Sequence, residues 1–250
     1  MSNQLYSAYH TNFTLPAFVS AGTILAIRPS AANGIRVVRM WVAPGIQAAQ
    51  TGTFTVSVSR QAAGQPTGLT PIVPTPLSTN YSASTITGGT LRSTTITAGS
   101  NGAALPQATI NVASTAGFPS SGSVIIDISG SRQLVSYTGL TGTTFTGCTG
   151  GTGTLATNNG VTNTIGIAAG TVGVLSHQAT PTNGAGALTY LLWQTSMMQP
   201  GWLWTPSSTS GINDEIMLPN GSAEALVIRL ETAPTTASAL WRAGIVYEEV

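Results

Sequence analysis

The stretch "GTFTVSVSR", residues 52–60, alternates apolar and small polar side chains without a break. Phe54, Val56 and Val58 share one side of an extended strand, and the residues between them share the other side. This alternation is typical of an antiparallel strand with one face in a core and the other in a polar environment. The sequence has no run of apolar residues at helical spacing, so it predicts an all-β protein.

Further strands are expected on both sides of this stretch. The first third of the chain predicts strands over 12–20, 23–29, 35–44 and 52–61. Large hydrophobic residues return after residue 165, in "TVGVLSHQ", "ALTYLLWQT", "GWLW", "DEIMLP", "EALVIRL" and "ALWRAGIVYEEV". Together these runs give about eight to ten strands, the number found in a jelly-roll-like two-sheet sandwich.

The middle of the chain has a different composition. Four prolines between residues 66 and 76 interrupt any strand ladder. Residues 82–164 then contain only three charges, Arg92, Asp127 and Arg132, and many threonines and glycines. Strands are expected there over 108–113, 123–129, 133–137 and 143–147. The sequence therefore predicts a jelly-roll domain over 1–81 and 165–250, interrupted by a small β-rich insertion domain over 82–164.

Charge is scarce throughout the chain. Charged residues make up 6% of the sequence, against about 25% in a typical soluble protein. The net charge of +1 gives no footprint for nucleic acid, and no apolar run approaches the roughly 18 residues of a membrane helix. So few charges favour self-association, and permanent incorporation into an assembly would bury such a surface. The start "MSNQLYSAYHTNF" lacks the features of a signal peptide, so synthesis in a cytoplasm is expected.

Groups that carry chemistry are few and scattered. His10 and His177 are the only histidines, and neither has a partner at metal-site spacing. Neighbouring acids at 214–215 and 248–249 point to opposite faces of a strand, which does not suit a catalytic pair. The single cysteine, Cys148, has no base nearby and is expected to be a packing residue. The sequence thus predicts no catalytic residue, no metal and no cofactor, and a protein that is not an enzyme.

Aromatic residues are the remaining candidates for contact with a partner. Trp202 and Trp204 share one face of the strand in "GWLW". Tyr6, Tyr9 and Phe13 precede the first clear strand and are candidates for an arm that orders on a neighbouring subunit. Such rings serve as anchors of a protein interface or stack on sugars, and the sequence leaves both alternatives open.

One segment resembles a known family. Residues 110–155 read "INVASTAGFPSSGSVIIDISGSRQLVSYTGLTGTTFTGCTGGTGTL", with the pattern "GFP-x-SG", two paired strands, "YTG" and "TFTGC-x-GG". This pattern resembles a small β module that recurs in structural proteins of tailed bacteriophages. The flanking segments "GIRVVRMWVA" and "LVIRLETAPTTASALWRAGIVYEEV" are similar in style to phage jelly-roll proteins of the capsid decoration, or cement, type.

The resemblance implies a virion component made in the host cytoplasm. Members of this family typically form a homotrimer that clamps the lattice of major capsid protein from outside. The motifs are architectural, so the resemblance transfers no functional residue. The alternative is a jelly-roll protein of a tail fibre or baseplate, in which the tryptophans contact a host glycan.

Overall fold

The chain folds almost entirely into β-strands. The computed structural model describes residues 4–14, 22–44, 53–61, 66–129, 131–166, 168–174, 189–196, 202–206, 215–231 and 240–250. Within these ranges the only helix is one 3₁₀ turn, η1 (Ala98–Ser100), and no helix is long and apolar enough to cross a membrane. The prediction of an all-β protein is confirmed.

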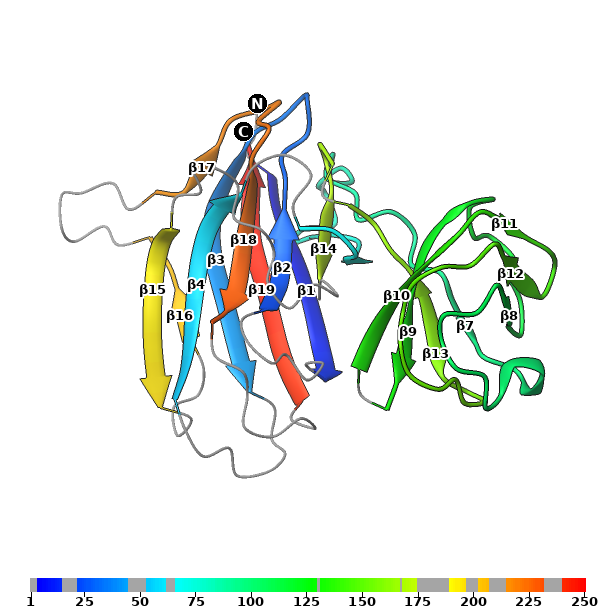
Figure 1. Ribbon diagram of the computed structural model, residues 1–250. Helices are drawn as coiled ribbons and strands as arrows, with labels where there is room; N and C mark the ends of the chain where they lie inside the picture. Colours follow the sequence, from blue (N-terminus) through cyan, green and yellow to red (C-terminus); the bar gives the residue numbers. More distant parts are fainter. Residues whose placement is uncertain are drawn as a thin grey trace.

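Two six-stranded sheets form a sandwich (Figure 1). The first sheet has the order β16 (Trp202–Trp204), β3 (Ile35–Pro44), β19 (Leu240–Glu249), β1 (Gln4–Thr14) and β6 (Thr75–Pro76), and β17 (Met217–Leu218) also pairs with β3. The second sheet has the order β15 (Thr189–Ser196), β4 (Thr53–Gln61), β18 (Ala225–Leu230), β2 (Gly22–Ile27), β14 (Val172–Val174) and β5 (Thr70–Pro71).

The connections between these strands are jelly-roll-like. The chain changes sheet at each step from β1 to β4, and β4 pairs with β15 within the second sheet. It changes sheet again between β16, β18 and β19. This wrapping brings β19, the last strand, between β1 and β3 in the centre of the first sheet.

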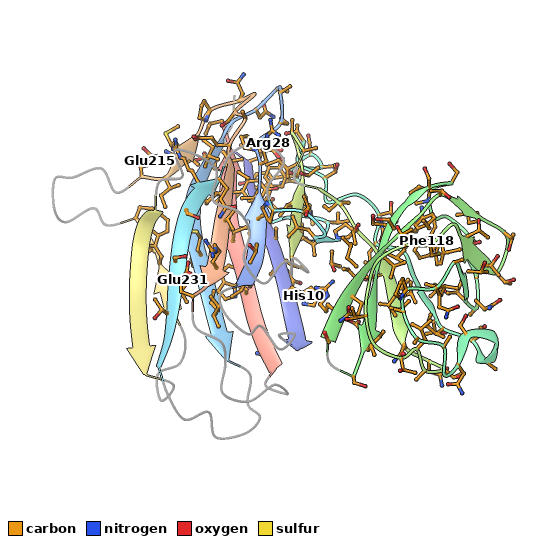
Figure 2. The ribbon with its side chains drawn as sticks, viewed as in Figure 1. His10, Arg28, Phe118, Glu215 and Glu231 are labelled. Atoms are coloured by element: carbon orange, nitrogen blue, oxygen red, sulfur yellow. The ribbon has the colours of Figure 1, made fainter. Side chains whose placement is uncertain are left out.

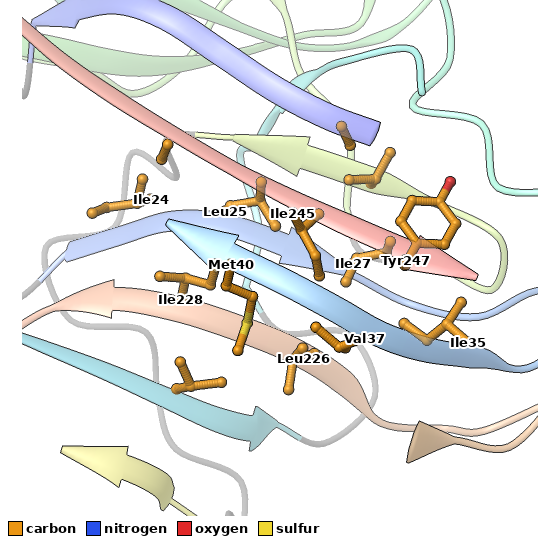
Figure 3. Close-up of a cluster of buried hydrophobic side chains, with 14 of the residues drawn as sticks. Ile24, Leu25, Ile27, Ile35, Val37, Met40, Leu226, Ile228, Ile245 and Tyr247 are labelled. Atoms are coloured by element: carbon orange, nitrogen blue, oxygen red, sulfur yellow. The ribbon is translucent and has the colours of Figure 1, made fainter. Parts of the chain in front are cut away.

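The core lies between the two sheets. Figure 3 shows that Ile24 and Ile27 of β2, Met40 of β3 and Ile228 of β18 meet there with Ile245 of β19. All five side chains are buried completely. The apolar runs of the sequence are therefore the inner faces of strands that are distant along the chain.

The outer face of the second sheet is also covered. Strands β2 and β18 are buried along their whole length. In β4, Val56 and Val58 point into the core as predicted, but Ser57 and Ser59 are buried too. The environment on that side of β4 is polar, since the Ser57 hydroxyl donates a hydrogen bond to Glu231, although both serines are buried.

The beginning of the described chain is a strand of the first sheet. Residues 4–14 form β1, which pairs with β19 from Gln4 opposite Glu249 to Thr14 opposite Leu240. The predicted arm at this place is wrong for residues 4–14, because their backbone hydrogen bonds are made within the sheet. The predicted strand at 12–20 extends into residues outside the described part of the chain.

A smaller β-structure is inserted between β6 and β14. Its four-stranded sheet has the order β10 (Ser131–Tyr137), β9 (Gly122–Ile128), β13 (Gly160–Asn163) and β7 (Ser93–Thr95). Its three-stranded sheet has the order β11 (Gly139–Leu140), β12 (Thr144–Thr146) and β8 (Thr109–Asn111). The four strands predicted here are present, and Figure 2 shows Phe118 inside this structure, away from the labelled Glu215 and Glu231 of the sandwich.

The insert has a core of its own, built from the residues of the motif. Phe145 lies at the centre, with ring centroids 5.2 Å from Phe118 and 4.7 Å from Tyr137. Cys148 and Val124 are buried in the same cluster. In the stretch 147–153 the four glycines have left-handed backbone conformations, which explains the glycine content by turn geometry.

The segment that leads into the insert is fixed to the sandwich. Ser84 and Thr85 hydrogen bond to the carboxylate of Glu249, and Ser84 Oγ lies 2.8 Å from the hydroxyl of Tyr247. Ile86 is buried in the sandwich core. The composition predicts an insert that begins at residue 82, whereas residues 84–86 pack with the sandwich.

An arginine joins the insert to the sandwich on another side. The Arg132 guanidinium of β10 donates to Thr70 Oγ1 of β5 at 2.6 Å and lies 3.9 Å from the Asp127 carboxylate. Burial lowers the pKa of Arg132, and Asp127 opposes this shift. Leu69 and Ile165 form a β-bridge beside this contact, so both connecting segments are held in place.

The division into two folding units stays a prediction, and the structure sharpens its test. A Cβ on Gly89 would lie 4.0 Å from Ile165 Cγ2, so a short Gly-Ser linker should replace residues 90–164 without strain. We expect this variant to unfold cooperatively in urea, because it keeps the complete sandwich core. An insoluble variant, or one without a cooperative transition, would contradict the division.

A second deletion serves as its control. Replacing residues 82–164 also removes Ser84 and Ile86 from the sandwich. We expect it to be less stable than the first variant by roughly 2–5 kcal/mol, the cost of truncating a buried isoleucine. Equal stability of the two variants would mean that the contacts of residues 84–86 contribute little.

Cys148 gives a probe of the insert core. Burial raises the pKa of its thiol, so the reactive thiolate is scarcer than in a free cysteine at pH 8. We expect Ellman's reagent to react slowly with the native protein and to titrate one thiol per chain after denaturation. Fast reaction of the native protein at the rate of a small thiol would contradict the buried position.

Candidate interaction surface

Tyr6, a predicted interface anchor, is a core residue. Its side chain is 2% exposed and stacks on Tyr247 with 5.7 Å between ring centroids. Its hydroxyl donates to Gln4 Oε1, and burial raises the pKa of the phenol. The prediction that Tyr6 contacts a partner is therefore corrected, because the ring is used to close the sandwich.

The other predicted residues do not converge on one surface. Tyr9 is 52% exposed on the outer face of β1. Trp204 is partly buried and packs against the sandwich core. The side chains of Phe13 and Trp202 lie outside the described residues. Of the five candidates, Tyr9 is the one whose described side chain points outward as an interface anchor would.

The outer face of the first sheet carries a row of residues in register across four strands. Leu203 of β16 lies opposite Trp41 of β3, Trp41 lies opposite Gly244 of β19, and Gly244 lies opposite Tyr9 of β1. Directly opposed residues share a face of a sheet, so the four form one line, named here the Trp41 row. Leu203 is 62% exposed, and Trp41 is half-buried.

Gly244 makes the flat arrangement of this row possible. A Cβ built on Gly244 would lie 2.2 Å from Trp41 Cζ2 and 2.5 Å from Cη2. The indole therefore lies directly over the backbone of β19, which any larger residue would prevent. A glycine inside a strand often marks such a close approach, and this was the signal in "ALWRAGIVYEEV" that could have identified the site.

Two arginines flank the Trp41 row. The Arg39 guanidinium lies over the Trp41 ring, 5.3 Å from its centroid. Arg242 lies opposite Ala43, on the other side of Trp41 along the strands, and both arginines are exposed. Stacking of a guanidinium on an aromatic face leaves its N–H groups free to donate in the plane of the group.

An ion-pair cluster closes one end of the same face. Arg36 Nε donates to Glu248 Oε2 at 2.6 Å, and Arg36 Nη1 lies 3.3 Å from Glu215 Oε1. The hydrogen bonds to Glu248 are the main cause of a raised pKa of Arg36. Glu248 is 3% exposed, so its carboxylate is held in the ion pair and is not solvated.

This surface offers aromatic, aliphatic and guanidinium groups, which are suited to binding a partner. No group of three His, Cys, Asp or Glu residues in the described part of the chain is placed to hold a metal ion. Trp, Tyr and Arg are the residue types enriched at the energetic centres of protein interfaces. Sequence reasoning missed Trp41 and Arg39, because the pairing that aligns them with Tyr9 involves strands far apart in the chain.

Comparisons with known proteins give little. No family model and no curated protein matches the sequence. Among solved structures the chain is similar to VP17, a capsid protein of bacteriophage P23-77, at 14% identity and a TM-score of 0.14, covering 98% of this chain and 88% of that chain. A TM-score this low does not establish a shared fold.

The Trp41–Gly244 contact predicts an unusual effect of a small substitution. Gly244→Ala should destabilise the protein by about 1–3 kcal/mol in urea unfolding, because its methyl group overlaps the indole. In a Trp41→Ala background the same change should be neutral or stabilising, since alanine is favoured over glycine in a strand by roughly 0.5–1 kcal/mol. The double-mutant cycle measures this coupling.

Gly142→Ala provides the matched control. A Cβ there would meet nothing within 4 Å, so this variant should unfold close to the wild type. If Gly244→Ala has the same effect with and without Trp41, the indole does not lie over Gly244.

Proposed function

We propose that the chain is a virion structural protein, a decoration protein that binds the assembled capsid shell from outside and stabilises it. In this role the protein acts as a homotrimer on the lattice of major capsid protein. It has no catalytic activity and needs no metal or cofactor. Binding energy gained only on the assembled shell would stabilise that shell by mass action.

The observation that carries the proposal is the motif in residues 110–155, together with the place of its residues in the fold. Phe118 of "GFP", Tyr137 of "YTG", and Phe145 and Cys148 of "TFTGC" are all buried in the insert core. The motif thus encodes a compact β-structure and no reactive group. This supports the architectural role that its resemblance to phage structural proteins implies.

The surface of the sandwich is the second support. Strands β2 and β18 of the second sheet are buried along their whole length, whereas the first sheet exposes Tyr9 and Leu203 beside half-buried Trp41. With only 6% charged residues, the chain has little electrostatic repulsion to keep such a face apart from other proteins. A permanent place in an assembly would bury it.

The alternative is a tail-fibre or baseplate protein that binds host-surface carbohydrate. The exposed ring of Tyr9 beside Trp41 favours it, because sugar rings stack on aromatic faces. The described outer residues of β3, β19 and β16 include no Asn, Gln or Asp to hydrogen bond sugar hydroxyls, and their one acid, Glu248, is paired with Arg36. The decoration role therefore has the better support.

The test uses the phage whose genome encodes this chain. We expect cryo-electron microscopy to locate the protein as trimers distributed over the shell. Particles that lack it should release their DNA at a lower temperature or at lower ionic strength than complete particles. Adding the purified protein back should restore the resistance.

Two results would contradict the proposal. Particles without the protein that resist heat and low salt unchanged would exclude a stabilising role. Protein found only on the tail or at one vertex would favour the adhesin, which a glycan-binding assay with the purified chain would then examine.

A further inference from the structure

The first sheet exposes large apolar side chains on part of its outer face, although Ser7, Val246 and Glu248 of the same face are buried. Strands β2 and β18 of the second sheet are buried on both faces. On the first sheet, Tyr9, Leu203 and Met217 remain exposed, by 52%, 62% and 42%. The Trp41 row runs across the middle of this face, so a partner that covers it would contact four strands at once.

Two arginines of this face lack a charged partner in the described part of the chain, whereas Arg36 is paired with Glu215 and Glu248. The described arginines with neither a hydrogen bond nor an ion pair from the guanidinium within the described residues are Arg39, Arg92 and Arg242. Arg39 and Arg242 flank Trp41, whereas Arg92 belongs to the insert. The guanidinium of Arg39 is already oriented by the indole, which lowers the entropy lost when it binds a planar carboxylate.

The carboxylates in the described part of a second copy are already engaged within that copy. Every acid in the described part of the chain already has a charged or hydrogen-bonding partner within it: Asp127, Glu215, Glu224, Glu231, Glu248 and Glu249. Asp214 alone lies outside the described residues. Charge complementarity therefore favours a different protein with exposed acidic side chains.

We propose that the outer face of the first sheet docks on an acidic surface of another protein, with Arg39 and Arg242 pairing with its carboxylates around the Trp41 row. The identity of that protein as the shell subunit rests on the proposed function. The exposed leucine and methionine favour a protein over an acidic polysaccharide, since sugars are bound by aromatic rings together with amide and acid groups.

The test compares a double variant with a matched control. Arg39→Ala/Arg242→Ala removes both charges from the face, and Arg92→Ala removes the third unpaired arginine from the insert. All variants should keep the wild-type circular dichroism and melting temperature. Arg39→Lys/Arg242→Lys keeps the charge without the planar fork and should bind with intermediate affinity.

Binding is measured in two ways, on shells that lack the chain and on an immobilised glutamate-rich peptide. Wild type and Arg92→Ala should bind both, with affinity that falls as salt rises. The double variant should bind shells at least about tenfold more weakly, as expected for the loss of two interfacial charges. The double variant should also elute earlier than the wild type from the immobilised glutamate-rich peptide, named here the glutamate matrix.

The outcomes separate this inference from the proposed function. If wild type and double variant bind shells equally well, the decoration role stands and the docking face is wrong. If no form binds shells, the decoration role fails, and selective retention of wild type on the glutamate matrix would still support the face. Equal retention of both forms on the glutamate matrix would overturn it. So would retention of wild type on a matching column of alginate, an acidic polysaccharide, but not on the glutamate matrix.

Discussion

Insertion of β19 between β1 and β3 is the constraint on which the rest of the structure depends. Its register places Ala243, Ile245 and Tyr247 in the core and Gly244 under Trp41. The same register brings Glu248 to Arg36 and Glu249 to the segment that leads into the insert. Because side chains alternate along a strand, a slip of one residue would turn the core residues outward and break all of these contacts together.

The insert depends on the same strand while keeping its own core. Ser84, Thr85 and Ile86 are fixed by Glu249 and the sandwich core, so the chain leaves the sandwich from a defined point. The Arg132–Thr70 contact fixes it on another side. Neither contact involves the residues that pack around Phe145 in the insert core, so the insert could vary in sequence or size without disturbing the pairing of the sandwich strands.

The local sequence pattern was sufficient to predict the strands, but not which strands pair or which residues meet across them. Alternation in β4 and the apolar run of β3 correctly predicted extended elements, because side-chain periodicity reflects burial on one face. Tyr6 and Tyr9 looked equivalent in sequence, yet an offset of three residues puts them on opposite faces of β1. The alternation places Ser57 on the polar side of β4, and its burial there comes from packing that no local pattern records. The Trp41 row could not be predicted for the same reason, since it depends on which strands pair with β3 and β1.

Because the chain has few charged residues, each unpaired arginine has a large effect on the distribution of charge over the surface. Nearly every carboxylate is used inside the chain, to hold Arg36, to fix Ser84 or to pair with a neighbouring arginine. The net charge of +1 is therefore not spread evenly over the surface, and two of the three arginines without a charged partner in the described residues lie on the outer face of the first sheet. The chain has no lysine, so Arg39 and Arg242 are the cations of this face that are available to an anionic partner. The scarcity of charge thus concentrates the unpaired cations on one face, and a lattice of acidic subunits that buries this face would satisfy them.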